Sequence, residues 1–223
     1  MYHFAILLPE RRYLAYFLKH IQKNLSLEYY EGMADHAVSE SIYIHDPDFN
    51  GIEIYRDRQP SEWKWKDHTV HMVTEPLNVK DLLKDSITVD NEWNDLPPKT
   101  SIGHIHLQVS NLFKAKKFYH EILDLNHTAT FPGAYFFAAN RYHHHVATNT
   151  WLGENISPAI NDNKKPGLDH YAINLPSRND LILLKKHLLE FKIDIYEKLL
   201  ENDNQFSSSF YVYDLDGIKI QFV

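Results

Sequence analysis

The chain has 223 residues, of which 43% are hydrophobic, and it carries a formal net charge of −7 at neutral pH. It contains no cysteine, which excludes disulfide bonds, thiolate metal sites and cysteine nucleophiles. The acidic balance argues against a nucleic-acid partner, because binding to phosphates depends on a basic surface. The sequence shows no signal pattern and no uninterrupted apolar run of about eighteen residues. We therefore expect no membrane insertion and a cytoplasmic location.

Three stretches share one order of features: a histidine in an apolar strand, a turn, and an amphipathic helix. They read MYHFAILLPERRYLAYFLKHI at the start, IGHIHLQVSNLFKAKKFYHEIL from Ile102, and LDHYAINLPSRNDLILLKKHLL from Leu168. Apolar residues recur at helical spacing after each strand, which predicts helices over residues 14–25, 115–122 and 181–191. The chain is therefore built from three repeats.

Each predicted helix is followed by segments rich in aromatic and β-branched residues, at 40–57, 134–151 and 208–223. Asp, Pro, Asn and Gly interrupt these segments at turns, so they are typical of paired strands. The fold class expected is α+β. We expect a lone module at 1–74, a linker at 75–100 with a short helix near 79–83, and a tandem pair of modules at 101–223.

Two repeats carry the same kinds of polar residue at nearly equal spacing: His3, Tyr43 and Glu53 in the first, and His170, Tyr211 and Gln221 in the third. Strand alternation places Glu53 on the face opposite its apolar neighbours, away from the helix-packed core. His3 can project to the same side. Two imidazoles and one carboxylate with open positions suit non-haem Fe(II), and Mn(II) can occupy such a site.

The chain resembles the vicinal oxygen chelate superfamily, which includes glyoxalase I, fosfomycin resistance proteins and extradiol ring-cleaving dioxygenases. Three motifs carry the resemblance: GHIHLQVSNLFKAKKFYHEILDL, DHAVSESIYIHDPDFNGIEIYRDRQPSEW and YHHHVATNTW. Together they look most like those of bacterial catechol-2,3-dioxygenase-like proteins. The resemblance implies paired βαβββ modules that curl around a metal cleft. It also implies a divalent metal, with Fe(II) favoured over Mn(II), and a small aromatic diol or quinol substrate that reacts with O2.

Ring-cleaving relatives have four modules, whereas three are present here, so the resemblance implies that the first module is missing. His3 and Glu53 then represent two of the three metal ligands of the first pair. The second pair has histidines at both expected places, His104 and His170, but has Gln221 where a carboxylate is expected. An ungapped alignment of the turn puts Lys219 there instead. Because neither side chain neutralises a divalent ion, we expect this second cleft to bind metal weakly.

The resemblance also suggests residues that handle protons. Tyr43 and Tyr211 occupy the place of an active-site tyrosine, and His145 occupies that of an active-site histidine. His36 is a further candidate for proton transfer. Each has a structural alternative, since tyrosines in aromatic strands commonly pack with the hydroxyl at the edge, and a histidine before a strand can be a turn residue. His106, His120, His127 and His187 are interpreted as structural.

The activity implied is that of a metal-dependent ring-cleaving dioxygenase. Two alternatives remain open: a non-catalytic remnant or binding module of the same fold, and a glyoxalase-like isomerase or lyase. The lone first module is expected to leave one flank uncovered. We therefore expect a homodimer in which the first modules of two chains pair symmetrically.

Overall fold

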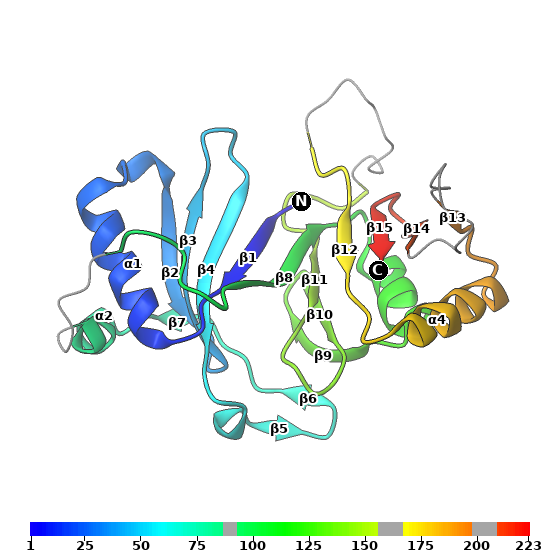
Figure 1. Ribbon diagram of the computed structural model, residues 1–223, viewed down its shortest axis with the longest axis horizontal. Coiled ribbons are helices and arrows are strands. Elements are labelled where there is room, and N and C mark those ends of the chain that lie inside the picture. Colours follow the sequence, from blue (N-terminus) through cyan, green and yellow to red (C-terminus); the bar gives the residue numbers. More distant parts are fainter. Residues whose placement is uncertain (87–92, 156–166, 198–208) are drawn as a thin grey trace. The chain divides into compact units, whose positions relative to one another are not determined.

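The computed structural model describes residues 1–86, 93–155, 167–197 and 209–223, and the chain divides into two compact units (Figure 1). Unit 1 comprises Met1–Gln108 and Asn126–Asn149, and unit 2 comprises Val109–Leu125 and Thr150–Val223. Within the described ranges, no helix is long and apolar enough to cross a membrane.

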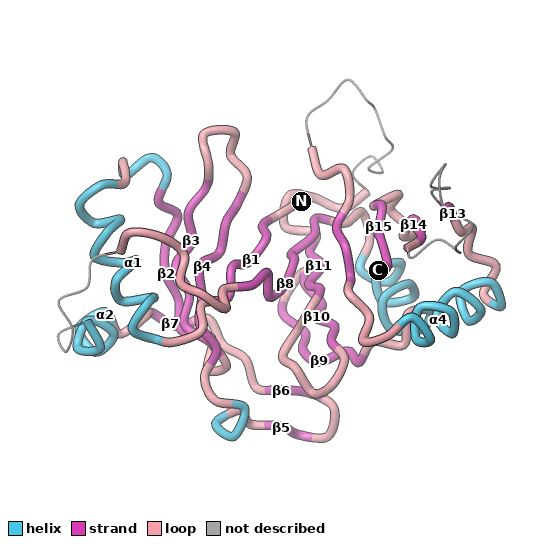
Figure 2. Tube along the Cα trace, in the orientation of Figure 1, coloured by secondary structure: helices cyan, strands magenta, loops and turns pink. Residues whose placement is uncertain are grey.

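Unit 1 is organised around a nine-stranded sheet with the strand order β7-β2-β3-β4-β1-β8-β11-β10-β9 (Figure 2). Its strands are β1 (His3–Leu7), β2 (Tyr30–Asp35), β3 (Ser39–His45), β4 (Gly51–Asp57), β7 (Glu75–Pro76), β8 (Ser101–Gln108), β9 (Asn126–Phe131), β10 (Ala134–Ala138) and β11 (Val146–Asn149). A separate hairpin pairs β5 (Trp65–Lys66) with β6 (Thr69–Val70). The helices of this unit are α1 (Arg11–Asn24), α2 (Val79–Leu82) and three short 3-10 turns, η1 (Leu27–Tyr29), η2 (Pro60–Glu62) and η3 (Leu83–Ser86).

The second repeat contributes to both units, and the expected division into 1–74, 75–100 and 101–223 stays a prediction. Strands β8 to β11 of the second repeat continue the sheet of the first repeat, and α3 (Leu112–Lys116) with the π-helical turn η4 (Lys117–Ile122) belongs to unit 2. β1 is parallel to β4 on one side and antiparallel to β8 on the other. Both edges of β1 are thus paired within the chain, which satisfies its backbone N–H and C=O groups. The homodimer stays a prediction.

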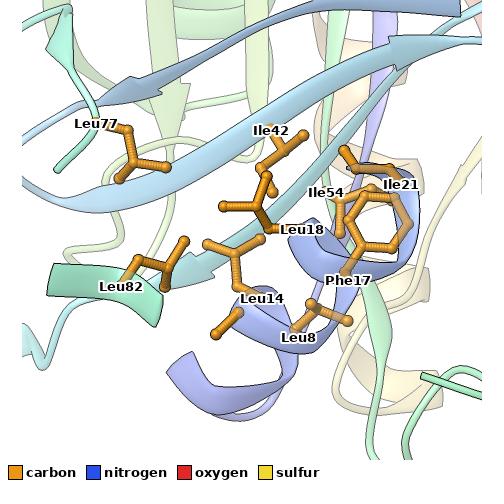
Figure 3. Packing of buried hydrophobic residues seen from close by; sticks show 10 residues of the cluster. Leu8, Leu14, Phe17, Leu18, Ile21, Ile42, Ile54, Leu77 and Leu82 are labelled. Atoms are coloured by element: carbon orange, nitrogen blue, oxygen red, sulfur yellow. The ribbon is translucent and has the colours of Figure 1, made fainter. Parts of the chain in front are cut away.

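Helix α1 covers the face of the sheet formed by β3 and β4. Its stripe of buried apolar residues matches the predicted periodicity, and Leu14 and Leu18 are fully buried. Figure 3 shows these side chains packing against Ile42 of β3 and Ile54 of β4. The helix ends where the backbone of Leu25 turns to extended geometry while its N–H still bonds to the carbonyl of residue 21. Truncating a side chain packed like Leu18 to alanine typically costs about 2–5 kcal/mol.

A buried carboxylate holds the N-terminal end of α1 against the sheet. Glu40 is 2% exposed and accepts hydrogen bonds from Arg11 Nε (2.7 Å) and Arg56 Nε (2.8 Å). Burial alone would raise the pKa of Glu40, but the hydrogen bonds and charges of Arg11 and Arg56 outweigh it and hold the pKa below its ordinary value. The carboxylate is therefore ionised and bound on both sides.

Unit 2 contains a four-stranded sheet with the order β12-β15-β14-β13. Its strands and remaining helix are β12 (Tyr171–Ile173), α4 (Arg178–Glu190), β13 (Tyr196–Glu197), β14 (Phe210–Tyr213) and β15 (Lys219–Phe222). Ser177 caps α4: its hydroxyl oxygen accepts the N–H of Asp180 (3.2 Å) and its O–H donates to the Asp180 carboxylate (2.6 Å). The expected helix at 181–191 is confirmed, and it begins three residues earlier because of this cap.

Asp214 closes the turn between β14 and β15. Its Oδ1 accepts the N–H groups of Asp216 (2.9 Å) and Ile218 (2.8 Å), and its Oδ2 accepts the hydroxyl of Tyr119 (2.8 Å). Burial raises the pKa of Asp214 to about 6, although these hydrogen bonds act in the opposite direction.

The Glu40 cluster gives a first test. A Glu40→Gln substitution removes the charge and leaves Arg11 and Arg56 without their buried partner, so we expect the free energy of unfolding to fall by about 3–5 kcal/mol. The matched control is Glu10→Gln, which removes an exposed pair with Arg12. Urea denaturation should leave this control unchanged. Equal losses in the two variants would contradict the role assigned to Glu40.

The raised pKa of Asp214 gives a second test. The native state binds a proton more tightly than the unfolded chain, whose ordinary value is 3.8, so this carboxyl favours folding at low pH and the benefit is lost as the pH rises from about 4 to about 6. Hydrogen-exchange protection of β14 and β15, corrected for intrinsic rates, should fall by up to about 3 kcal/mol over that range and then level off. The Asp214→Asn variant should remove this slope; an unchanged slope in the variant would reject the assignment.

Candidate metal centre

Three buried side chains of unit 1 converge on one point. Glu53 Oε2 lies 3.0 Å from Nε2 of His3 and 3.0 Å from Nε2 of His104. All three side chains are buried, and the prospective ligand atoms lie within 4.8 Å of one another. Among the described residues, this is the set of histidine and acidic side chains that has metal-binding spacing.

Strand register brings the three residues together. Ala5 on β1 faces Glu53 on β4 and also His104 on β8, so β1 separates the carboxylate strand from the second histidine strand. His3 lies opposite Gly51, where a Cβ atom would stand 2.4 Å from the carbonyl oxygen of Tyr2. Any side chain at Gly51 would therefore push β4 away from His3. Glu53 points away from the helix-packed side, as strand alternation predicts.

The surroundings set the charge state of the cluster. Ser41 donates its hydroxyl hydrogen to Glu53 Oε1 (2.6 Å), which leaves Oε2 for the imidazoles. Burial by itself would raise the pKa of Glu53, but His104 and His3 outweigh it and hold the pKa well below its ordinary value. Burial lowers the pKa of His104, and the neighbouring His3 adds to that effect. An ionised carboxylate beside neutral imidazoles is the state in which these groups act as metal ligands.

The donor set fits a divalent cation. Nε2 of His3 is buried and has no hydrogen-bond partner of adequate geometry in the described residues, despite its closeness to Glu53. Such an atom is unfavourable in a metal-free protein but is a ready lone-pair donor to a cation. Two imidazole nitrogens and one carboxylate oxygen match the facial arrangement of non-haem Fe(II) sites.

Further histidines surround this cluster, and the sequence analysis did not assign them to it. The ring of His106 lies 4.9 Å from that of His3, and the ring of His144 lies 4.1 Å from that of His104. Burial lowers the pKa of both His106 and His144 well below the ordinary value, so both are neutral. In the sequence, only the spacing of His104 and His106 indicated that His106 lies near the cluster, since residues two apart in a strand share a face.

The run His143 to His145 lies just before β11, which begins at Val146, so its side chains do not follow the alternation of a strand. His143 and His144 are both buried, and their Nδ1 atoms lie 2.8 Å apart in a hydrogen bond. His145 is exposed and stacks on Tyr142, with 4.8 Å between ring centroids.

Tyr43 and His36 lie next to the cluster and bond to each other. Nδ1 of His36 donates to the carbonyl oxygen of Val73 (2.7 Å), which can only accept, so in the neutral ring Nε2 accepts the hydroxyl hydrogen of Tyr43 (2.7 Å). The ring of Tyr43 lies 5.7 Å from that of His3. Burial, and then the charge of Glu53, raise the pKa of Tyr43 well above its ordinary value, so its phenol stays protonated.

The residues grouped in the second cleft fall into different units. His104 and His145 belong to unit 1, and His104 joins His3 and Glu53; the remaining members, His170, Tyr211 and Gln221, belong to unit 2. There, Gln221 donates to Ser209 (3.3 Å), and the His170 ring lies 5.5 Å from that of Tyr211. Lys219 places its ammonium group 4.5 Å from the centre of the same tyrosine ring. Because β8 bonds to β1, His104 joins His3 and Glu53 within unit 1, and its pairing with His170 of unit 2 stays a prediction.

The fold and the buried cluster together define a protein of repeated βαβββ modules with a histidine and carboxylate centre. Residues 101–222 match the Glyoxalase/Bleomycin resistance protein/Dioxygenase superfamily, and the chain belongs to that superfamily. This confirms the family inferred from the motifs and the expected fold class.

One relative stands at a much higher identity than the structural neighbours. The chain is 40% identical over 188 residues to a catechol-2,3-dioxygenase of Bacillus subtilis (strain 168), a match that covers 82% of this chain and 63% of the relative. A crystal structure of a candidate dioxygenase from Bacillus subtilis subsp. subtilis str. 168 aligns with 99% of this chain and 60% of its own, at 11% identity and a TM-score of 0.57. A fosfomycin resistance protein, FosX from Listeria monocytogenes, solved with Mn(II) and sulfate, aligns with 55% of this chain and 87% of its own, at 14% identity and a TM-score of 0.40. The chain thus spans less than two thirds of the length of the catechol-2,3-dioxygenase and of the candidate dioxygenase.

The geometry predicts which substitutions abolish metal binding. After anaerobic loading with Fe(II) or Mn(II) and desalting, elemental analysis should find about one ion per chain. Glu53→Gln and His104→Ala should each reduce the retained metal by at least about tenfold, because each removes a ligand.

The controls are His68→Ala, an exposed histidine, and His170→Ala, which should both retain metal as the unaltered chain does. Circular dichroism verifies that each variant is folded. Loss of metal in His170→Ala with retention in His104→Ala would place the centre elsewhere.

Proposed function

We propose that this protein is a metal-dependent, extradiol-type ring-cleaving dioxygenase that acts on a small aromatic diol or quinol with O2. The observation that carries the proposal is the position of Glu53 Oε2, 3.0 Å from the Nε2 atoms of both His3 and His104 in a buried site. The 40% identity to a protein named catechol-2,3-dioxygenase supports it.

His3, His104 and Glu53 would hold the metal ion, for which we propose Fe(II), with Mn(II) as the alternative. When bound, such an ion supplies Lewis acidity and open coordination positions suited to vicinal oxygens and O2. Glu53 would neutralise only one of the two charges of a divalent ion, because an imidazole binds a metal in its neutral form. The remaining positive charge favours an ionised diol oxygen over a neutral one.

Tyr43 and His36 would take the proton that the diol loses. The Tyr43 hydroxyl donates to Nε2 of His36, so its oxygen can accept a proton from substrate while its own proton passes to His36. The tyrosine stays neutral throughout, in agreement with its raised pKa. The Nδ1–H bond to Val73 orients the imidazole for this transfer and stabilises the imidazolium that results.

An oxygen electrode tests the proposal. The Fe(II)-loaded chain should consume O2 with catechol or a substituted catechol, and Tyr43→Phe should lower kcat by about 100-fold with a smaller effect on KM, because the proton path is broken while the metal ligands remain. The matched control is Tyr211→Phe, the corresponding tyrosine of the third repeat, which should leave the rate unchanged.

The alternatives give different results. Metal retention without O2 uptake across a panel of catechols would favour the isomerase or lyase interpretation. A chain that retains no metal and consumes no O2 would be the non-catalytic form.

A further inference from the structure

A cavity of about 630 Å³ opens in unit 1 at the C-terminal ends of β1 and β4, and Trp65 of β5 contributes to its lining. Its volume lies within the range of small-molecule pockets, about 300–1,000 Å³. The side chains His3, Glu53 and His104 are not among those that line it. The cavity is therefore a candidate ligand site that is separate from the metal centre.

The lining carries more positive than negative charge, although the chain as a whole is acidic at −7. Three cations, Arg58, Lys99 and Arg141, face one carboxylate, Asp57. Arg58 is neutralised by Asp35 at 2.6 Å. Lys99 and Arg141 have no acidic partner in the described part of the chain. Two basic groups are thus left for an anion.

Asp57 keeps its charge but does not pair with Lys99 or Arg141, and both of its oxygens are engaged by other donors. Oδ2 accepts the hydroxyl of Tyr142 (2.8 Å), and Oδ1 accepts Nε2–H of His143 (2.7 Å). Tyr55 adds a hydrogen bond to Tyr142 at 2.9 Å. Gly103 leaves the space that Tyr55 fills, since a Cβ there would stand 1.7 Å from the tyrosine oxygen. These contacts fix the floor of the cavity before a ligand arrives, which lowers the entropy lost on binding.

The walls are flat and aromatic. Trp63, Trp65 and Tyr142 line the cavity together with proline rings. The indole N–H of Trp63 is bonded to the carbonyl of Val38 at 3.1 Å, so its ring is held in place. The Arg141 guanidinium lies 5.0 Å from the centre of the Trp65 ring, where it is oriented by the aromatic face and keeps its N–H groups available.

We propose that this cavity binds an aromatic carboxylate of one or two rings. The ring packs against the aromatic side chains of Trp63, Trp65 and Tyr142, and the carboxylate pairs with Arg141 and Lys99. Guanidinium and carboxylate form the stronger, charge-assisted type of hydrogen bond, and an aromatic ring exploits the flat walls. This site is separate from the metal centre and stands whether or not the proposed ring cleavage occurs.

Isothermal titration of the full, Mn(II)-treated chain with 2-naphthoate tests the inference. We expect one saturable site, and at least about tenfold weaker binding by 2-naphthamide, which lacks the charge, and by cyclohexanecarboxylate, which lacks the aromatic ring. Arg141→Gln should weaken 2-naphthoate binding at least about tenfold. Arg141 is exposed, so the variant should fold.

Two further variants separate this site from the metal centre. Arg12→Gln, an arginine on α1 that pairs with Glu10, and Glu53→Gln, at the metal centre, should both bind 2-naphthoate as the unaltered chain does. Loss of binding in Glu53→Gln with retention in Arg141→Gln would show that the carboxylate binds at the metal centre and would overturn the proposal. So would the absence of saturable binding, or equal affinity for the amide.

Discussion

Strand β1 forms backbone hydrogen bonds to β4 on one side and to β8 on the other, and everything at the candidate metal centre depends on this arrangement. The parallel pairing with β4 belongs to one repeat, whereas the antiparallel pairing with β8 joins two repeats into one sheet. Because side chains alternate along a strand, the register fixes which residues meet on its inner face. A shift of one residue in β8 would turn His104 away from Glu53.

Charge balance is the second constraint. A carboxylate as buried as Glu53 is unfavourable unless a cation or strong hydrogen-bond donors compensate it. Ser41 donates to one oxygen, and Nε2 of His104 lies 3.0 Å from the other, although burial lowers the pKa of that imidazole. An imidazole in its neutral form can donate one hydrogen bond to the carboxylate but leaves its negative charge in place. A divalent cation would complete the compensation, and it would also give the buried Nε2 of His3 a partner.

At the cavity next to the Tyr55, Tyr142 and Asp57 network, the charge that lacks a partner is positive, whereas at the metal centre it is negative. There the carboxylate is already satisfied by a phenol and an imidazole, and unpaired basic groups face the open space. One sheet face thus presents a site suited to a cation near its middle and, at the ends of β1 and β4, a site suited to an anion.

Local patterns in the sequence were enough to predict the repeats, the helices and the outward orientation of Glu53. Helical spacing identified α1 and α4 because each buries an apolar stripe, and the regular spacing of His3 and Glu53 singled out both residues. The partner of this pair was not predictable in the same way. His104 and His170 both follow the pattern of a first-strand histidine, and the choice between them depends on which repeats share a sheet.

That choice is made by contacts about one hundred residues apart, which no local pattern records. The run His143 to His145 illustrates the same limit at short range. Within a strand, adjacent histidines would point to opposite faces, but this run lies in a bend before β11 and its first two members are both buried. The roles of Tyr43 and His36 in proton transfer remain predictions, now with a hydrogen bond between the two side chains to support them.

Crystals of the Mn(II)-loaded protein, measured at the manganese absorption edge, test the central claim most directly, because anomalous scattering locates the ion independently of any activity. The account predicts one strong peak within coordination distance of His3 Nε2, Glu53 Oε2 and His104 Nε2. A peak beside His170 and Gln221, or manganese bound without contact to Glu53, would contradict it.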